Sequence, residues 1–445
     1  MRKVLLTWAL VAVRAVPGLE RDRGIFVSTA ERLLAGDRLY VEAWDNKDPL
    51  FYYVLAAGRM VSPLMDVVVE LTWLLIACLA ALALGRHLGC STAQAVLGAF
   101  VVTPVILTGA HYIAGYTNLP GTALTLLALA LSVNRRYAAG GAVLGVLLFL
   151  KITNLPLAVA MVAVVVIRRR ARRGGAVLAA GFVAAAGVIA ALLQWRGELT
   201  PYLQTLRDNL TYAQGPLIDP AWAGIPGHLG RVLLAGAVTT VVATVLILVI
   251  DRWLLRGGSD LWPVAAVGLA VAMGILAVSG MWPHHAQILY APAVLTGLLV
   301  VRHLPEADRP AAIATAVLTG VLLAGGTPLF HPALPDDLAG RTAALPPGSY
   351  ARVGLNDDFG HAYGLRDREL ACPRFAQYPF DSPEVLAQTA DCLPQADVIL
   401  VAPSAVPDPQ YPAWNAYLEG VERLLQQQYS CQPRDGARIC TRTNI

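Results

Sequence analysis

The chain has 445 residues, of which 56% are hydrophobic and 14% are charged, and its mean hydropathy is +0.56. Such values exclude an ordinary soluble protein and indicate a polytopic membrane protein surrounded by membrane lipids. The formal net charge is only +4, and the basic residues lie in short runs between apolar segments. This distribution is typical of membrane orientation signals and gives no reason to expect a nucleic-acid partner.

Apolar segments predict about eleven membrane spans, which form an all-α transmembrane domain over residues 1–330. They run roughly over 4–19, 66–88, 93–110, 119–133, 138–150, 154–167, 175–194, 229–250, 261–281, 286–301 and 311–330. The first has no small-residue cleavage site, so we expect an uncleaved span. Arginine clusters between segments favour the cytoplasmic side, which places the N-terminus inside and the C-terminus outside. Richness in Ala, Val, Gly and Arg is typical of a bacterial genome and predicts the bacterial cytoplasmic (inner) membrane.

Residues 137–167 are too short for two full crossings. They number 31, whereas two crossings need about 40 residues. Both flanks nevertheless carry arginine clusters of the cytoplasmic type. We therefore expect a short helical hairpin whose tip, Lys151 to Asn154, lies below the outer surface, as is tolerated where helices line a cavity.

The first extracytoplasmic loop, residues 20–65, is expected to hold two surface helices. Ser28 to Leu34 has a helical pattern that Gly36 ends, and Leu50 to Met60 forms a second apolar stretch. The loop at 195–228 is rich in aromatic side chains of the kind found at a membrane interface. These aromatics are Trp195, Tyr202, Tyr212 and Trp222.

Four ionisable residues gather in the first loop: Asp22, Asp45, Lys47 and Asp48. Ionisable groups near a bilayer are costly, so the cluster is a candidate functional site. Asp22 follows the first span and is a candidate general base that takes a proton from an attacking hydroxyl. The alternative is an interfacial ion pair between Asp22 and a neighbouring arginine.

Lysine occurs at only three positions, two of which are candidates for phosphate binding. Lys47 lies between two aspartates and is followed by Pro49, so its compact ammonium is suited to a phosphate. The alternative is a solvated loop held by interfacial aromatics. Lys151, at the hairpin tip, reaches the same phosphate or extends to the membrane surface.

His284 and His285 lie at the outer end of a late span, where they are candidates for binding a phosphate or a metal ion. Two adjacent histidines do not easily chelate one ion, and the membrane part has no matching Cys/His set. We therefore assign no metal site, although a divalent metal remains possible as a cofactor. The chain also lacks the P-loop, nucleophile-elbow and H-E-x-x-H motifs, so nucleotide hydrolysis is not expected.

The polar tail, residues 331–445, predicts a small extracytoplasmic α/β domain. Tyr350 to Leu355 and Asp397 to Ala402 are predicted strands, of which the second is apolar enough to be buried on both faces. A helix is expected to begin after Ser382, and an amphipathic helix covers Trp414 to Tyr429.

The cysteines indicate an oxidising compartment for the tail. Cys372, Cys392, Cys431 and Cys440 all lie there, and an even number confined to one segment suggests two disulfides. Three pairings are possible, of which we favour 372–392 with 431–440 because they close the shorter loops.

The first loop resembles the GT-C superfamily of membrane glycosyltransferases. It is most similar to the bacterial branch related to protein O-mannosyltransferases and the lipid A aminoarabinose transferase. In that branch an acidic residue and a Gly follow the first span, then LL-x-G with a Tyr, and then W-D-x-K-P-P-L-x-Y-Y. The matching residues are Asp22-Arg23-Gly24, Leu33-Leu34-Ala35-Gly36, Leu39-Tyr40 and Trp44-Asp45-Asn46-Lys47-Asp48-Pro49-Leu50 with Tyr52-Tyr53. Asp48 replaces the usual first Pro.

Two further segments are similar to the family. Gly145 to Lys151 matches the opening of the hairpin, and Pro283-His284-His285 to Tyr290 matches a late span with an outward His or Tyr. The resemblance covers roughly 15–165 and 280–300 and is specific in the first loop. It does not extend to the tail.

The resemblance implies a sugar donor linked to polyprenyl phosphate and transfer to a glycan, lipid or protein acceptor of the cell envelope, outside the cytoplasmic membrane. Asp22 would be the base, and Lys47 and Lys151 would bind the donor phosphate. Supporting roles would fall to Asp45, Tyr53, His284 and His285. Two alternatives are a polyprenyl-lipid transporter or flippase, which would need charges in several spans, and a non-catalytic scaffold for envelope assembly.

Overall fold

The computed structural model describes residues 21–62, 65–92, 94–95, 98, 117–214, 261–278, 287–303, 346–354, 369–374, 377, 381, 383–403, 405–434 and 437–443. The spans expected at 4–19, 229–250 and 311–330 lie outside these residues, as do His284 and His285. The orientation of the termini and the count of eleven spans therefore stay predictions.

The chain divides into two compact units. The helical unit comprises Met1–Pro17, Leu64–Leu192 and Ile218–Leu329, and the mixed unit comprises Gly18–Pro63, Leu193–Leu217 and Phe330–Ile445. The last segment begins next to the boundary expected at residue 331. The first loop, however, groups with the tail and not with the transmembrane domain to which we assigned it. The reason is that its helices and the segment after Trp195 make their polar contacts with each other and with residues 372–374.

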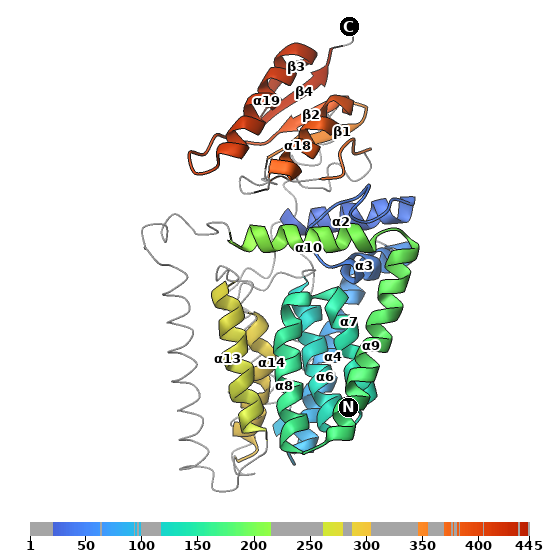
Figure 1. The fold of residues 1–445 in the computed structure, drawn as a ribbon, viewed down its shortest axis with the longest axis vertical. Coiled ribbons are helices and arrows are strands. Elements are labelled where there is room, and N and C mark those ends of the chain that lie inside the picture. The colour runs from blue at the N-terminus through green and yellow to red at the C-terminus, as the bar shows by residue number, and fades with distance from the viewer. Residues whose placement is uncertain are drawn as a thin grey trace. The chain divides into compact units, whose positions relative to one another are not determined.

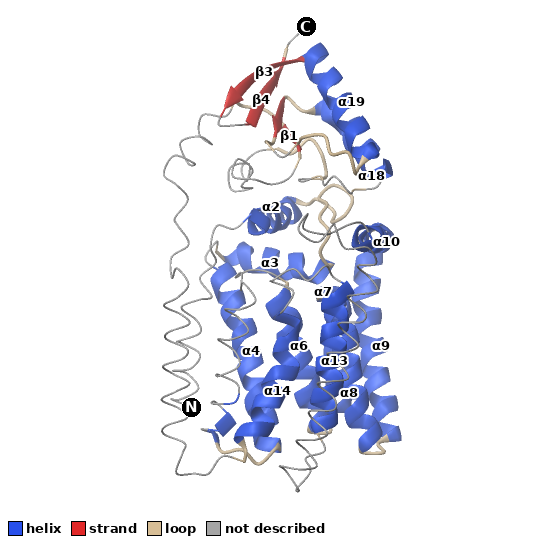
Figure 2. Ribbon diagram, turned by 90° about the vertical axis from the view of Figure 1, so that its left-hand side faces the viewer, coloured by secondary structure: helices blue, strands red, loops and turns tan. Residues whose placement is uncertain are grey.

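The helical unit is built from apolar helices that pack side by side (Figure 2). Its elements are α4 (Met65–His87), α6 (Asn118–Val133), α7 (Tyr137–Leu150), η1 (Ile152–Asn154), α8 (Leu155–Arg168), α9 (Arg172–Trp195), α13 (Trp262–Val278) and α14 (Tyr290–Val301). The buried core includes Leu84, Leu126, Met161 and Leu298 from α4, α6, α8 and α14. Among the described residues, two helices, Val68–His87 and Arg172–Trp195, are long and apolar enough to cross a membrane by length and composition.

Two helices with their tip at the expected residues cover 137–167, whereas the depth of the tip in the membrane stays a prediction. α7 ends at Leu150, and Lys151 has an extended backbone with φ of −159°. A single 3₁₀ turn follows before α8 starts, with a proline in its first turn, where the missing N–H costs nothing. The tip packs against α6, because a Cβ atom on Gly121 would lie 2.8 Å from Lys151 Cγ.

Glycines set the spacing between α7 and α9. A Cβ atom on Gly141 would lie 1.9 Å from the carbonyl oxygen of Leu178, and one on Gly181 would lie 2.2 Å from that of Ala138. No side chain fits at these positions without separating the helices. Small residues allow such close approach where lipid removes the hydrophobic drive for helix association.

The mixed unit contains helices from three parts of the chain and one small sheet (Figure 1). The first loop supplies α2 (Arg21–Ala35) and α3 (Pro49–Val61), and the segment after α9 supplies α10 (Leu199–Gln214). The tail supplies β1 (Tyr350–Val353), α18 (Pro383–Cys392), η4 (Leu393–Gln395), β2 (Val398–Val401), α19 (Pro412–Gln428), β3 (Tyr429–Arg434) and β4 (Ala437–Arg442).

The tail sheet has the strand order β1-β2-β4-β3, with β1 and β2 parallel and the other two pairs antiparallel. Alternate residues such as Val353 and Ile399 face α18 and α19, where Trp414 is fully buried. All four residues of β2 are buried, as the unbroken apolar run predicts. The expected small α/β domain is thus present in the tail.

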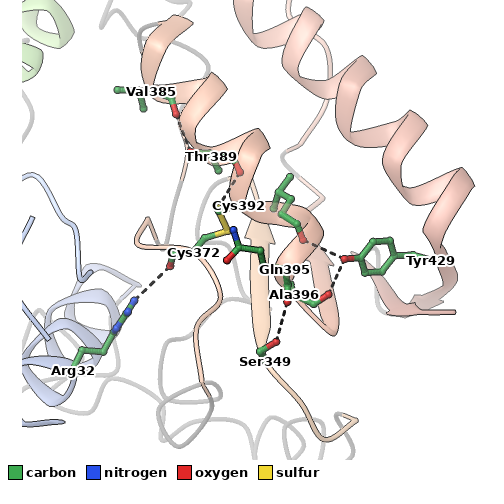
Figure 3. The surroundings of a disulfide bond; sticks show 10 residues. Arg32, Ser349, Cys372, Val385, Thr389, Cys392, Gln395, Ala396 and Tyr429 are labelled. Carbon is green, nitrogen blue, oxygen red and sulfur yellow. Dashed lines mark hydrogen bonds between the residues drawn. A yellow bond between two sulfur atoms is a disulfide. The ribbon is translucent and has the colours of Figure 1, made fainter. Parts of the chain in front are cut away.

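Two disulfides join the cysteine pairs expected from loop length. Cys372 bonds to Cys392 at the end of α18 (Figure 3), and Cys431 bonds to Cys440, its direct partner across β3 and β4. Chain-entropy arguments assign each such bond about 3 kcal/mol of stability. The bonds are therefore a main restraint on the described part of the tail.

Candidate functional site

The first loop folds as two helices joined by residues 36–48, as predicted. α2 ends at Ala35 because Gly36 takes a left-handed conformation, φ +107°, and its N–H bonds to the carbonyl of Leu33. α3 begins after Asp48 with Pro49 in its first turn. The connection between these two boundaries carries Asp45 and Lys47.

Tyrosines hold this connection in shape. The Tyr52 hydroxyl donates to Asp45 Oδ2, and the Tyr40 hydroxyl donates to the backbone carbonyl of Lys47 at 2.6 Å. Tyr40 itself has φ of +65°, which a bulky residue rarely adopts, and its N–H bonds to the Ala43 carbonyl at 2.7 Å. Such strain persists only where surrounding contacts enforce it and is concentrated at functional sites.

The Lys47 ammonium is half-buried, and its Nζ donates to Asn46 Oδ1 at 2.6 Å. It also lies 5.7 Å from the centroid of the Phe26 ring, within the range of a cation–π contact. Among the described side chains, no carboxylate forms a salt bridge with it. An ammonium has three donors, so further donor capacity remains for an anionic ligand.

The two aspartates beside Lys47 in sequence have other partners. Asp45 is bonded to Tyr52, and Asp48 Oδ1 accepts from the Tyr202 hydroxyl in α10 at 2.8 Å. Burial raises the pKa of Tyr202, and the charge of Asp48 raises it further. The phenol therefore stays protonated and able to donate. Asp48, which departs from the family pattern, anchors α10 to the start of α3.

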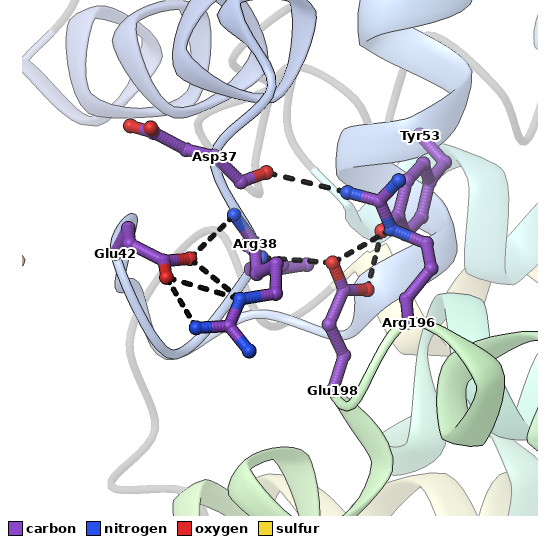
Figure 4. A network of polar contacts seen from close by, with 7 residues as sticks. Asp37, Arg38, Glu42, Tyr53, Arg196 and Glu198 are labelled. Atoms are coloured by element: carbon purple, nitrogen blue, oxygen red, sulfur yellow. Dashed lines mark hydrogen bonds and ion pairs between the residues drawn. The ribbon is translucent and has the colours of Figure 1, made fainter.

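Glu198 is the residue that sequence reasoning missed. Its carboxylate is fully buried and accepts from the Leu39 N–H at 3.0 Å, from Arg196 Nε at 2.8 Å and from the Tyr53 hydroxyl (Figure 4). Burial raises the pKa of Tyr53, and its hydrogen bond to Glu198 adds to the rise. The only available signal was Arg196-Gly197-Glu198 directly after an apolar segment, which carries no recognised motif.

Asp22 lies in the first turn of α2, and its side chain lies outside the described part of the chain. Its backbone lies about one helical turn before that of Phe26 in α2. The Phe26 ring packs against Phe51, with centroids 5.0 Å apart, and faces the Lys47 ammonium. Residue 22 is thus one helical turn from the ring that the ammonium contacts.

The remaining candidates have no determined position relative to this cluster. Lys151 belongs to the helical unit, so a shared role with Lys47 stays a prediction. His284 and His285 lie outside the described residues. Within the described ranges, no group of three or more His, Cys, Asp or Glu side chains is placed to hold a metal ion.

Comparison with known proteins identifies a fold. No family model matches the sequence, and no curated protein matches it. Among solved structures, the chain is similar to the archaeal oligosaccharyltransferase AglB from Archaeoglobus fulgidus, determined in complex with an inhibitory peptide and a dolichol-phosphate. The TM-score is 0.50 at 13% identity, over 99% of this chain and 74% of that one. At this identity the likeness shows the fold alone: the chain shares the GT-C fold of AglB.

Proposed function

We propose that the chain is a membrane glycosyltransferase that transfers a sugar from a polyprenyl-phosphate donor to a cell-envelope acceptor on the outer side of the bacterial cytoplasmic membrane. The observation that carries the proposal is the Lys47 ammonium. It is half-buried, unpaired with any described carboxylate, and lies against Phe26 one helical turn from Asp22. A fixed cation with spare donor capacity is what the departure of a phosphate leaving group requires.

In the proposed reaction, the acceptor hydroxyl oxygen forms a bond to the anomeric carbon of the donor sugar while the bond from that carbon to the phosphate oxygen breaks. The lipid phosphate leaves with the electron pair, and Lys47 stabilises its charge. Asp22 takes the proton of the attacking hydroxyl as general base. The family resemblance implies inversion at the anomeric carbon.

The surrounding residues position Lys47. Tyr40 holds its backbone carbonyl, Tyr52 holds Asp45, and Asn209 of α10 donates to the Asn46 carbonyl at 2.9 Å. A catalytic group must be held to a fraction of an ångström, and hydrogen bonds to buried partners provide this restraint. The network therefore supports a positioned ammonium and not a freely solvated one.

The shared fold supports the class of donor. AglB was solved with a dolichol-phosphate, which is a polyprenyl-type phosphate, and with a peptide. Only the class of lipid is carried over to this chain. The sugar, the acceptor and the side of the membrane rest on the sequence arguments for the first loop and the disulfide-bonded tail.

Binding of a polyprenyl phosphate to the full chain in lipid nanodiscs tests the proposal. Undecaprenyl phosphate, which carries no sugar, serves as the probe. Lys47→Ala is expected to weaken its binding at least about tenfold, because a charge-assisted hydrogen bond is lost. Lys47→Arg should retain part of the affinity, since a planar guanidinium replaces a point charge poorly.

The matched control is Arg423→Ala, which removes an exposed cation from α19 in the tail. It should leave the affinity unchanged. Wild-type affinity in Lys47→Ala would contradict the phosphate role. Comparison of cells with and without the chain completes the test: loss of one envelope glycan with accumulation of its donor lipid is expected, and unchanged glycans would contradict a transferase.

A further inference from the structure

A cavity of about 710 Å³ lies within the mixed unit, where the first loop, α10 and α18 meet. Its volume falls in the range of roughly 300–1,000 Å³ that is typical of small-ligand sites. Tyr40 and Trp44 line it from the first loop, Gln204 lines it from α10, and Glu384 and Gln388 line it from α18. The sequence motifs did not predict a cavity lined by these residues.

The polar lining combines hydrogen-bond donors and acceptors. Glu384 supplies a carboxylate, Arg374 a guanidinium, and Gln204 and Gln388 supply amides. Each of these groups is planar and presents two polar atoms side by side, a spacing suited to two neighbouring hydroxyls of a sugar ring. A sugar hydroxyl both donates and accepts, so its hydrogen-bonding chemistry matches that of each group. Arg207 adds a second guanidinium, so the lining carries both signs of charge and suits a neutral ligand that both donates and accepts hydrogen bonds.

One wall of the cavity is rigid. Arg374 is buried, and its guanidinium carbon lies 3.4 Å from the centroid of the Trp44 ring. The Trp44 indole N–H donates to Thr205 Oγ1 at 3.0 Å, and its backbone N–H bonds to the Pro373 carbonyl at 2.9 Å. These contacts tie three distant segments together. A wall that is ordered before binding lowers the entropic cost of binding a ligand.

The cavity adjoins the connection that carries Lys47. Tyr40 lines the cavity, and its hydroxyl donates to the Lys47 carbonyl; Trp44, which also lines the cavity, directly precedes Asp45. We propose that this cavity binds carbohydrate and holds the glycan acceptor of the transfer. The identity of that glycan as the acceptor rests on the proposed function, whereas carbohydrate binding itself does not.

A peptide ligand fits the lining less well. Extended peptides are bound largely through backbone hydrogen bonds, often along a free strand edge. The lining comes from the first loop, α10, α18 and residues 373–374, and it includes the polar residues Gln204, Glu384 and Gln388. The lining therefore favours a hydroxyl-rich ligand.

The test measures binding of neutral oligosaccharides of two to four units to the full chain in nanodiscs by saturation-transfer NMR. A disordered hydrophilic peptide and inorganic phosphate are run in parallel. At least one oligosaccharide is expected to bind, and the double variant Glu384→Gln with Gln388→Ala should weaken it at least about tenfold through lost hydrogen bonds. Gln204→Ala, on a different helix, should weaken it as well.

Asp391→Ala is the matched control, since Asp391 is an exposed residue of α18 outside the cavity lining. It should bind like the wild type. The proposal is overturned if no oligosaccharide binds, if the cavity variants bind as well as this control, or if only the peptide or phosphate shows saturation. Undecaprenyl phosphate binding that depends on Lys47 is measured on the same samples. If this phosphate binding persists while no oligosaccharide binds, the carbohydrate site is contradicted and the proposed function is not.

Discussion

The helical unit and the mixed unit differ in the polar groups that link distant segments. In the helical unit, glycines and apolar side chains join the helices, and neutral groups such as the Gln94 amide, which donates to the Val301 carbonyl at 3.1 Å, add links between them. In the mixed unit, buried Glu198 and Asp48 link segments about 150 residues apart in sequence. Apolar contacts are tolerant of sliding, whereas a hydrogen-bonded carboxylate specifies one arrangement. The mixed unit is therefore the part of the chain suited to holding a reactive group in place.

The largest effect on sugar transfer is expected from Asp22→Asn, which preserves the shape of the side chain and removes its charged carboxylate. Loss of a general base should lower transfer by at least about 100-fold. Binding of undecaprenyl phosphate should change little, because Lys47 holds the phosphate. The assay is sugar transfer from lipid-linked donor in membranes, with binding measured alongside. Transfer at the wild-type rate would reduce Asp22 to a member of an interfacial ion pair.

The second prediction concerns the contribution of the buried Glu198 carboxylate to the stability of the mixed unit. Glu198→Ala leaves the Arg196 guanidinium, the Tyr53 hydroxyl and the Leu39 N–H without their acceptor. Loss of one partner in a buried charged network costs roughly 3 kcal/mol, which should appear as a lower unfolding temperature. Glu42→Ala serves as control, since its pair with Arg38 is largely exposed and worth little. An equal effect of the two variants would contradict the role of the buried network.

Glycine substitutions test the close packing of helices α7 and α9 in the helical unit. Gly141→Ala puts a methyl group into the Leu178 carbonyl and should destabilise the chain by about 2 kcal/mol through overpacking. Gly187→Ala, in α9 with open space around it, should stabilise by about 0.5–1 kcal/mol because alanine is the better helix former. Thermal unfolding in one detergent compares them. If the unfolding temperatures of both variants shift in the same direction, the close approach of α7 and α9 is contradicted.

The smallest effect is expected from Tyr202→Phe, which removes one hydrogen bond to Asp48 and should cost about 1 kcal/mol. Burial raises the folded-state pKa of Tyr202 above that of an unfolded tyrosine. Its contribution is therefore fully present below about pH 10 and is lost as the pH rises above that value. When unfolding is followed from pH 8 to 11, the free energy of unfolding should fall less with rising pH in Tyr202→Phe than in the wild type. An identical pH dependence in both proteins would contradict this assignment.

Local signals in the sequence were sufficient to predict several structural elements and the disulfide partners. Backbone preferences and the spacing of apolar residues predict the end of α2 at Gly36, a second helix over the apolar stretch from Leu50, the hairpin tip at Lys151 and the buried strand at 398–401. The disulfide partners follow from loop length. Each of these depends on residues near one another in the chain, where a pattern is visible.

The partners within the site were decided only by the tertiary structure. Tyr53 with Glu198, Asp48 with Tyr202, and Trp44 with Arg374 join residues separated by more than 140 positions. A single buried carboxylate or tyrosine carries no periodic pattern, and its partner is set by how the segments fold back on one another. By itself, the sequence determined that the chain is apolar, helical and cysteine-bonded in its tail, and it marked Lys47 as a candidate. Only the fold showed that Asp45 and Asp48 are bonded to tyrosines, because side-chain pairing depends on distances in space and not on order along the chain.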